Sequence, residues 1–314
     1  MEMGVVMKST GSWYDVRSQD GKTVKCKIRG KIRLKGLRTT NPVAVGDKVR
    51  FEMQDEETGV ITGIEPRMNY IVRRSVNLSR AAHILAANID QALLLVTLKE
   101  PLTLPAFVDR FLVTAEAYHI PAVLIFNKID IYSEAELDTL RGFASVYWDV
   151  GYRCLEVSAE TGEGLETVRK LLANKVSLLS GHSGVGKSTL ANAVDSGLKL
   201  RTAALSESFR MGQHTTTFAE MHPLSFGGYV IDTPGIKGFG LVDFEKTEIA
   251  ERFPEMRALM SGCKFHNCVH VDEPQCAVKE AVEDGRIAWT RYDSYLKLYF
   301  NNEAEDTYRQ NPYS

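Results

Sequence analysis

The sequence predicts a multidomain protein with an all-β barrel at its start, an α/β domain with a mostly parallel sheet in its middle and a mostly α domain at its end. Three observations support this fold class. Short strands and turns fill about the first 73 residues, strands alternate with helices from about residue 89, and after Gly240 the pattern is helical with three clustered cysteines. We therefore expect domains at residues 1–73, 74–240 and 241–314, which suits a chain of 314 residues.

Composition is that of an ordinary globular protein, with 44% hydrophobic and 25% charged residues. The formal net charge of -2 means that any surface for nucleic acid must be local. No signal-peptide pattern opens the chain, and its most apolar stretch, residues 92–98, is too short to span a bilayer. We therefore expect a cytoplasmic protein without membrane contact. Its five cysteines should then be metal ligands and packing residues, not disulfides.

Strand periodicity marks the N-terminal barrel. Residues 48–53 alternate charged and apolar side chains, and Gly-containing turn signals recur between the short strands. Basic residues occupy the odd positions from Lys25 to Lys35, so a continuous strand would carry a cationic row on one face and core side chains on the other. Such a row suits single-stranded nucleic acid or rRNA, although a merely solvated face is the alternative. Gly30 could also form a bulge that breaks the alternation.

Alternating strands and helices predict the parallel sheet of the middle domain. A capping box of Ser133 and Glu136 should open one of its helices. The expected strands are residues 91–98, 122–126, 155–157, 176–179, 218–224 and 229–231, and the expected helices are 106–118, 164–172 and 187–194 together with the helix after Ser133.

A phosphate-binding loop is predicted from Gly181 to Ser188, which reads GHSGVGKS and matches GxxxxGK[ST] between a strand and a helix. Its backbone amides and the helix N-terminus would cradle phosphate oxygens. Lys187 should reach the β- and γ-phosphates, and Ser188 should ligate Mg²⁺. The alternative is a glycine-rich turn that matches the pattern by chance.

A second phosphate motif, DxxG, is predicted at the end of a strand. Asp232 should hold the Mg²⁺ shell, and the Gly235 amide can bond the γ-phosphate. Ras-type enzymes carry a glutamine after this motif to orient the attacking water, but here that position is Ile236. Hydrolysis therefore needs another group, a bound partner or both.

His214 is the candidate for that group, and with Lys187 and Asp232 it completes the predicted catalytic set. It lies in a segment reading GQHTTT, between the two phosphate motifs, where the first switch of a GTPase belongs. One of Thr215, Thr216 and Thr217 should ligate Mg²⁺ in the GTP state. A polar loop histidine without a catalytic part is the alternative for His214.

Guanine recognition is predicted from Asn127-Lys128-Ile129-Asp130, which reads NKxD at the end of an apolar strand. The Asp130 carboxylate would accept two hydrogen bonds from guanine, and adenine would leave it unpaired, a mismatch that can cost about 10⁴-fold. Asn127 should orient the base, the Lys128 stem should cover its face, and the Ser158 and Ala159 amides could bond its carbonyl oxygen. A surface turn with capping residues is the alternative.

These motifs occur in an unusual order. NKxD precedes the phosphate loop and DxxG follows it, whereas an ordinary GTPase has the phosphate loop first and NKxD last. The middle domain is therefore predicted to be a circularly permuted P-loop GTPase domain that binds GTP or GDP.

A zinc site is predicted in the last domain at Cys263, Cys268, His270 and Cys276. Three thiolates and one imidazole suit tetrahedral Zn²⁺, and four protein ligands leave no open position, so the ion would be structural. Buried free cysteines, a disulfide or another metal are the alternatives. Cys26 and Cys154 should be packing residues, and His266 should point outward.

An aromatic helix is predicted after this cluster, because apolar side chains recur at helical spacing. An amphipathic helix that packs this stripe is the main interpretation, and base stacking by exposed tyrosines is the alternative. The residues concerned are Trp289, Tyr292, Tyr295, Leu296 and Tyr299.

The chain resembles the RsgA family, the circularly permuted GTPases that act on the small ribosomal subunit. The resemblance covers nearly the whole chain and rests on NKID, SAE, GHSGVGKST, HTTT, DTPG and the cysteine-histidine cluster with its EPQCAV ending. It implies an N-terminal OB-fold barrel, a central permuted GTPase domain and a C-terminal zinc domain. It also implies GTP hydrolysis stimulated by the 30S subunit late in its maturation, with 16S rRNA as a partner.

The family's site residues fall on the motifs described above. The implied zinc ligands are Cys263, Cys268, His270 and Cys276. The implied nucleotide contacts are Asn127, Lys128, Ile129 and Asp130, and Gly181, His182, Ser183, Gly184, Val185, Gly186, Lys187, Ser188 and Thr189.

Two other functions are compatible with the residues. One is a GTPase of RNA modification or metal transport that works without the ribosome, and the other is an RNA-binding protein that holds GTP structurally, which Ile236 keeps open. Because the permutation places DxxG directly before the last domain, we expect movement around residues 232–239 to act on that domain. GTP would then set barrel and zinc domain to clamp rRNA. Nothing in the sequence requires more than a monomer.

Overall fold

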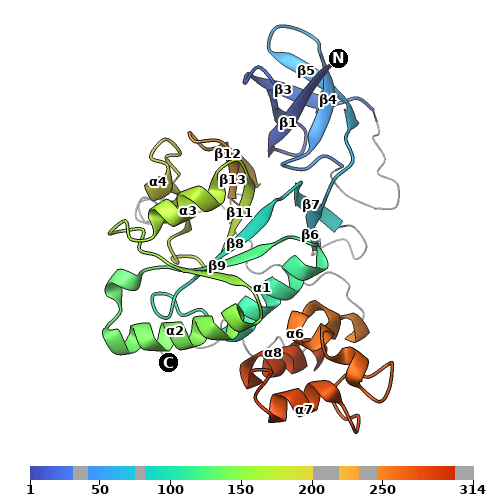
Figure 1. Ribbon diagram of the computed structural model, residues 1–314. Coiled ribbons are helices and arrows are strands. Elements are labelled where there is room, and N and C mark those ends of the chain that lie inside the picture. Colours follow the sequence, from blue (N-terminus) through green and yellow to red (C-terminus); the bar gives the residue numbers. More distant parts are fainter. Residues whose placement is uncertain (31–41, 75–81, 201–218, 233–245, 301–314) are drawn as a thin grey trace, which may run out of the picture.

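The computed structural model describes residues 1–30, 42–74, 82–200, 219–232 and 246–300, and Figure 1 shows the path of the chain. The N-terminal part is a closed barrel, because β1 pairs with both β2 and β4 and so closes the order β1-β2-β3-β5-β4. This confirms the predicted barrel. Its strands are β1 (Glu2–Ser9), β2 (Tyr14–Ser18), β3 (Thr23–Ile28), β4 (Lys48–Met53) and β5 (Thr58–Ile64).

Strand β3 has the alternation expected from the sequence. Lys25 and Lys27 are exposed and Cys26 is buried in the barrel core, with Arg29 exposed just after the strand. Gly30 follows with a φ of 63°. The remaining basic positions of the row, residues 31–35, lie outside the described residues.

The central sheet has the order β10-β9-β8-β11-β13-β12, and all its pairs are parallel except that of β12 with β13. This confirms the mostly parallel sheet. Its strands are β8 (Gln91–Val96), β9 (Ala122–Phe126), β10 (Arg153–Glu156), β11 (Val176–Ser180), β12 (Glu220–Pro223) and β13 (Tyr229–Asp232).

Among the described residues, two helices pack on each face of this sheet, which explains why β8 is buried along its whole length. Leu94 and Val96 pack with α1 (Pro105–Ala117) and α2 (Glu134–Asp149). Leu93 and Leu95 point the other way and pack with α3 (Leu165–Leu172) and α4 (Lys187–Val194). The strand ends at Val96, two residues earlier than predicted, because Thr97 starts a turn in which the Thr103 amide donates to its carbonyl at 2.9 Å.

The barrel is joined to the central sheet at two places. Lys8 of β1 pairs with Glu220 of β12, so the barrel and the sheet form one continuous set of hydrogen-bonded strands. The hairpin of β6 (Tyr70–Arg74) and β7 (Ala82–Ala87) lies between them in Figure 1. The boundary expected at residue 73 falls inside this hairpin, and the domain limits stay predictions.

The C-terminal region is a small helical unit that lies beside α1 (Figure 1). It comprises η3 (Lys246–Glu248), η4 (Ala250–Arg252), α6 (Pro254–Arg257), η5 (Met260–Gly262), α7 (Ala277–Glu283) and α8 (Trp289–Phe300). On α8, Tyr292 and Tyr295 are buried as the packing interpretation expects, whereas Trp289 is 63% exposed. Among the helices that the structure describes, none has the length and apolarity needed to cross a membrane.

Candidate nucleotide site and metal cluster

The predicted phosphate loop joins the end of β11 to the start of α4, and its glycines are required by its shape. Gly181, Gly184 and Gly186 have φ values of 138°, 85° and 97°, a region that favours glycine. A Cβ at Gly186 would lie 2.5 Å from Asn127 Nδ2, and one at Gly181 would lie 2.8 Å from the Leu95 carbonyl oxygen. Any other residue would therefore push the guanine motif or the central strand away from the loop.

Lys187 folds back onto this loop. Its ammonium group donates to the carbonyl oxygens of Gly181 and His182, both at 2.8 Å. Burial lowers the pKa of Lys187, and the negative charge of Asp232 acts in the opposite direction. Asp232 at the end of β13 lies opposite Leu179 of β11, the strand that leads into the phosphate loop, so the two phosphate motifs end side by side as predicted. Ser188 and Thr189 are half-buried in the first turn of α4.

The predicted guanine motif meets the phosphate loop through Asn127. This buried side chain donates from Nδ2 to the Val185 carbonyl at 2.8 Å and accepts from the Ala159 amide at 3.3 Å. One amide group therefore joins three segments that are far apart in sequence. The Ser158 hydroxyl donates to Asp130 Oδ1 at 2.5 Å, so that carboxylate is also held in place.

Three predicted contacts differ in detail from the expectation. The Ser158 amide, expected to face a ligand, donates to the Glu163 carbonyl at 3.0 Å, because residues 158–163 close on themselves as a turn. The side chains of Ile129 and Val185 are buried in the apolar clusters on opposite faces of the sheet. Only the backbone of these two residues is therefore available to a nucleotide.

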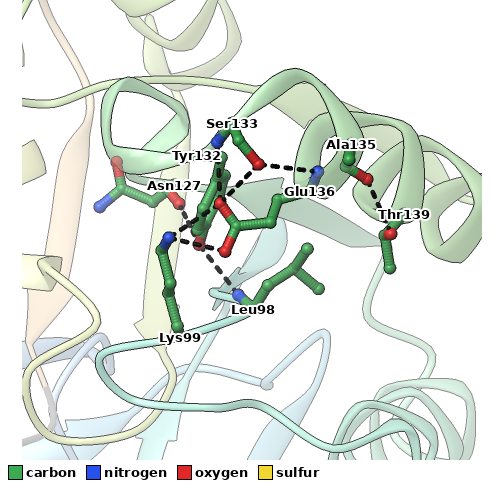
Figure 2. A network of polar contacts seen from close by, with 8 residues as sticks. All are labelled: Leu98, Lys99, Asn127, Tyr132, Ser133, Ala135, Glu136 and Thr139. Atoms are coloured by element: carbon green, nitrogen blue, oxygen red, sulfur yellow. Dashed lines mark hydrogen bonds and ion pairs between the residues drawn. The ribbon is translucent and has the colours of Figure 1, made fainter.

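A polar network under the guanine motif was missed by the sequence reasoning (Figure 2). The Tyr132 hydroxyl accepts from the Leu98 amide at 2.9 Å and donates to the Asn127 carbonyl at 3.3 Å. Lys99 pairs with both oxygens of Glu136 at 2.7 and 2.8 Å, and Glu136 closes the predicted capping box with Ser133. The network fixes the loop after β8 against the turn that presents Asp130.

Lys128 also contacts the loop that follows β8. Its backbone is left-handed, with a φ of 65°, and its ammonium group donates to the Glu100 carbonyl. The next residue, Pro101, lies against the phosphate loop, because its Cδ is 3.7 Å from where a Cβ on Gly184 would be. The loop of residues 97–104 therefore touches both halves of the candidate site.

Several predicted site residues lie outside the described residues. They are His214, Thr215, Thr216, Thr217 and Gly235, together with Ile236 and most of the DxxG motif after Asp232.

The predicted metal ligands form a compact cluster at Cys263, Cys268, His270 and Cys276, whose ligand atoms all lie within 4.8 Å of one another. Cys263 Sγ is 3.8 Å from Cys276 Sγ and 3.6 Å from His270 Nδ1, and His270 Nδ1 is 3.3 Å from Cys276 Sγ. A zinc ion with Zn–S bonds of about 2.3 Å has sulfur ligands about 3.8 Å apart, so these spacings fit a tetrahedral site. The four residues could hold a zinc ion.

The cysteines of the cluster form no disulfide with one another. All the described cysteines are free, which excludes a disulfide in this structure, and Cys26 lies in the barrel core as expected. Burial raises the pKa of the Cys268 thiol to about 12, so this thiol becomes a thiolate at neutral pH only when a cation binds it. His266 is exposed, as predicted.

Comparison with known proteins matches two parts of the chain to families of RsgA proteins. A family described as RsgA GTPase matches residues 64–242, and one described as RsgA N-terminal domain matches residues 3–61. The small ribosomal subunit biogenesis GTPase RsgA of Christiangramia forsetii is 53% identical over 313 residues, which is 99% of each chain. The protein of that name from Flavobacterium psychrophilum is 53% identical over 314 residues, which is 99% of this chain and 96% of the relative.

Two solved structures resemble the whole chain. YjeQ from Thermotoga maritima is 36% identical, with a TM-score of 0.79 over 96% of this chain and 99% of its own. YloQ, described as a circularly permuted GTPase, is 28% identical, with a TM-score of 0.73 over 96% of this chain and 95% of its own. The permuted order predicted from the motifs is therefore confirmed.

Proposed function

This chain belongs to the RsgA GTPase family, and on that premise we propose that it hydrolyses GTP while assisting late maturation of the small ribosomal subunit. The observation that carries the proposal is the junction at Asn127, whose side chain binds the Val185 carbonyl of the phosphate loop and the Ala159 amide. Two motifs in inverted sequence order are thereby held as one site, which suits a ligand with a purine at one end and phosphates at the other.

The nucleotide site uses the described residues as follows. The Lys187 ammonium, held over the phosphate loop by the Gly181 and His182 carbonyls, binds the β- and γ-phosphates. Asp130, oriented by Ser158, accepts two hydrogen bonds from guanine. Ser188 ligates Mg²⁺, and Asp232 at the end of β13 holds the shell of that ion. His214, with Lys187 and Asp232, serves hydrolysis, and one of Thr215 to Thr217 binds Mg²⁺.

The metal cluster holds one structural zinc ion through Cys263, Cys268, His270 and Cys276. The ion supplies charge that lets the buried thiols ionise, and it stabilises a region with few regular elements. No step of hydrolysis passes through it.

The barrel contributes a surface for rRNA. Lys25, Lys27 and Arg29 are exposed on or just after β3, and the Lys27 ammonium lies 4.2 Å from the ring centroid of the half-exposed Trp13. Cations beside an aromatic ring suit stacked, single-stranded bases. We place this activity in the cytoplasm, on the 30S subunit and its 16S rRNA, with the protein acting as a monomer.

GTP turnover measured with and without purified ribosomal subunits tests the proposal. We expect strong stimulation by 30S subunits and little by 50S subunits, with none in the Lys187→Ala variant. Equal, fast turnover without ribosomes would support a ribosome-independent GTPase instead. No turnover in any mixture would support an RNA-binding protein that holds GTP structurally.

The same preparation tests nucleotide control of ribosome binding. Sedimentation with 30S subunits should retain the protein in a non-hydrolysable GTP analogue and release it in GDP. Equal retention in both nucleotides would contradict a clamp governed by the GTP state.

A further inference from the structure

Helix α1 contacts the phosphate loop and the C-terminal region within a single turn. The ring of Phe107 stacks on that of His182 in the phosphate loop, with centroids 3.9 Å apart and planes 28° from parallel. Two residues further on, Asp109 accepts a hydrogen bond from Arg291 Nη1 of α8 at 2.6 Å. The N-terminal end of α1 therefore lies between the candidate phosphate site and the unit that carries the cluster of Cys263, Cys268, His270 and Cys276.

The contact with α8 is a buried ion cluster. Arg291 and Asp109 have side chains only 1% and 0% exposed. Glu255 of α6 binds the other side of the guanidinium through Nε at 2.7 Å and Nη2 at 3.1 Å, and Phe253 lies against it with its ring centroid 4.7 Å from Cζ. Buried charges tolerate little change of geometry, because a displaced partner leaves an uncompensated charge. The cluster thus sets α8 and the start of α1 in one relative position.

The same helix α8 reaches the metal cluster. The Tyr292 hydroxyl donates to the carbonyl of His270 at 2.7 Å, and the Tyr295 hydroxyl donates to the carbonyl of Val269. Adjacent residues of α8, Arg291 and Tyr292, therefore connect α1 with the loop that carries a metal ligand.

We propose that Arg291 is a positioning residue for the phosphate loop. Its ion pair with Asp109 fixes the N-terminal end of α1, and Phe107, two residues before Asp109, fixes His182 by stacking. The His182 carbonyl in turn holds the ammonium group of Lys187 at 2.8 Å. This inference rests on the proposed nucleotide site and adds to it a route from the C-terminal region to the phosphates that does not use the switch residues.

Coupling of this kind is reciprocal. If docking of the C-terminal region raises affinity for nucleotide, bound nucleotide must strengthen that docking by the same factor. A partner that pulls on the C-terminal region would then weaken nucleotide binding, and the proposed ribosomal partner is such a candidate.

The test measures Kd for GDP labelled with a methylanthraniloyl group, using the full-length protein. Asp109→Asn keeps the shape of the side chain and leaves Arg291 paired with Glu255, so the variant should fold. We expect its Kd to rise about fivefold or more. Phe107→Leu should raise Kd by a similar factor, whereas Phe107→Tyr, which keeps the ring, should match the wild type. The double variant D109N/F107L should be no weaker than the weaker single variant, because both changes act on one route.

Glu116→Gln is the matched control. Glu116 lies at the far end of α1 and pairs with Arg257 of α6 at 3.3 Å, so it also joins α1 to the C-terminal region but away from the phosphate loop. The Kd of the Glu116→Gln variant for labelled GDP should equal that of the wild type. Arg291→Lys replaces D109N if thermal melting shows that D109N is unfolded.

Three results would overturn the inference: an unchanged Kd in D109N, effects of D109N and F107L that multiply in the double variant, or an equal loss in E116Q. A wild-type protein that does not bind labelled GDP would instead refute the proposed function. The two failures are therefore distinguishable.

Discussion

The Asp130 carboxylate is oriented by a hydrogen bond within the protein. The Ser158 hydroxyl donates to it at 2.5 Å, and Asn127, three residues earlier, is fixed between the phosphate loop and Ala159. The polar groups of the candidate base site are therefore oriented in advance, which reduces the cost of ordering them when a ligand binds.

Replacing the Asp130 carboxylate should weaken GDP binding far more than removing the Ser158 hydroxyl that orients it. Asp130→Asn should weaken GDP binding by about 100-fold or more, because an amide cannot accept from both guanine donors. Ser158→Ala should cost only a few-fold, since the carboxylate itself remains. Calorimetry with GDP and ADP gives both values, and an Asp130→Asn protein that binds GDP as the wild type does would remove Asp130 from the site.

At this scale the sequence predicted which residues meet but not how they are held. Asn127, Asp130 and Lys187 were found because fixed motifs name them. Tyr132 and Lys99 were missed, because a tyrosine after NKxD and a lysine after β8 carry no local signal until the fold brings them to Leu98 and Glu136. The Phe107–His182 stack was missed for the same reason.

Helix α2 shows how one element anchors the site. Its capping box was predicted from Ser133 and Glu136, and the structure adds Lys99 as a second partner of the same carboxylate. The hydrogen bond from Lys99, followed by that from the Ser133 amide, lowers the pKa of Glu136 to about 2.

This shift predicts a pH dependence of stability. A carboxyl whose pKa falls on folding stabilises the native state fully above its ordinary pKa of about 4.3, and the stabilisation is lost as pH falls through the folded value. The melting temperature of the wild type should therefore exceed that of Glu136→Gln by a constant amount at neutral pH, and the difference should shrink as the pH falls from about 4.3 toward 2. A difference independent of pH in this range would mean that Lys99 does not pair with Glu136 in solution.

The folding of the C-terminal unit should depend on a metal ion bound at Cys263, Cys268, His270 and Cys276. If zinc binding supplies folding free energy, a chelator should lower the hydrogen-exchange protection of α7 and α8 by about 100-fold or more. The central strands β8 and β11 should keep their protection. Cys276→Ser should reproduce this loss without chelator, whereas Cys154→Ser, at a cysteine outside the cluster, should not. Unchanged protection in chelator would favour a fold held without a metal.

Over the whole molecule, the order of the parts could be predicted and their junctions could not. Motif order gave the permutation, and local periodicity gave nearly every strand of the sheet. The pairing of β1 with β12 at Lys8 and Glu220, and the buried ion pair of Asp109 with Arg291, join residues far apart in sequence. Periodicity carries no information about such partners, because it describes only the burial of each face.

A buried ion pair of Asp47 and Arg67 stabilises the junction between the barrel and the segment that follows it. Asp47, with a side chain 0% exposed, accepts from Arg67 Nε and Nη2 at 2.6 Å each and from the Ala44 amide at 2.8 Å. Arg67 also donates to the Pro42 carbonyl at 2.8 Å, so the pair ties the barrel to the segment that leads into the hairpin. Asp47→Ala leaves a buried guanidinium without its partner and should lower the free energy of unfolding by about 3–5 kcal/mol.

An exposed ion pair on the same barrel serves as a control, because it shows how much stability is lost when a carboxylate is removed from a solvated pair. Arg29 and Glu52, which are both well exposed, pair at 3.4 Å on the barrel, so Glu52→Ala should cost about 1 kcal/mol or less in urea unfolding. Because the Asp47 side chain binds Ala44 and Arg67, at the barrel and the segment after it, Asp47→Ala should keep its affinity for GDP. If the barrel binds rRNA as proposed, turnover with 30S subunits should nevertheless fall in this variant, since a loosened barrel is no longer held in a fixed orientation against β12 and the central sheet. Full stimulation in a folded Asp47→Ala protein would show that the barrel serves as a tether and that its fixed orientation plays no part in activation.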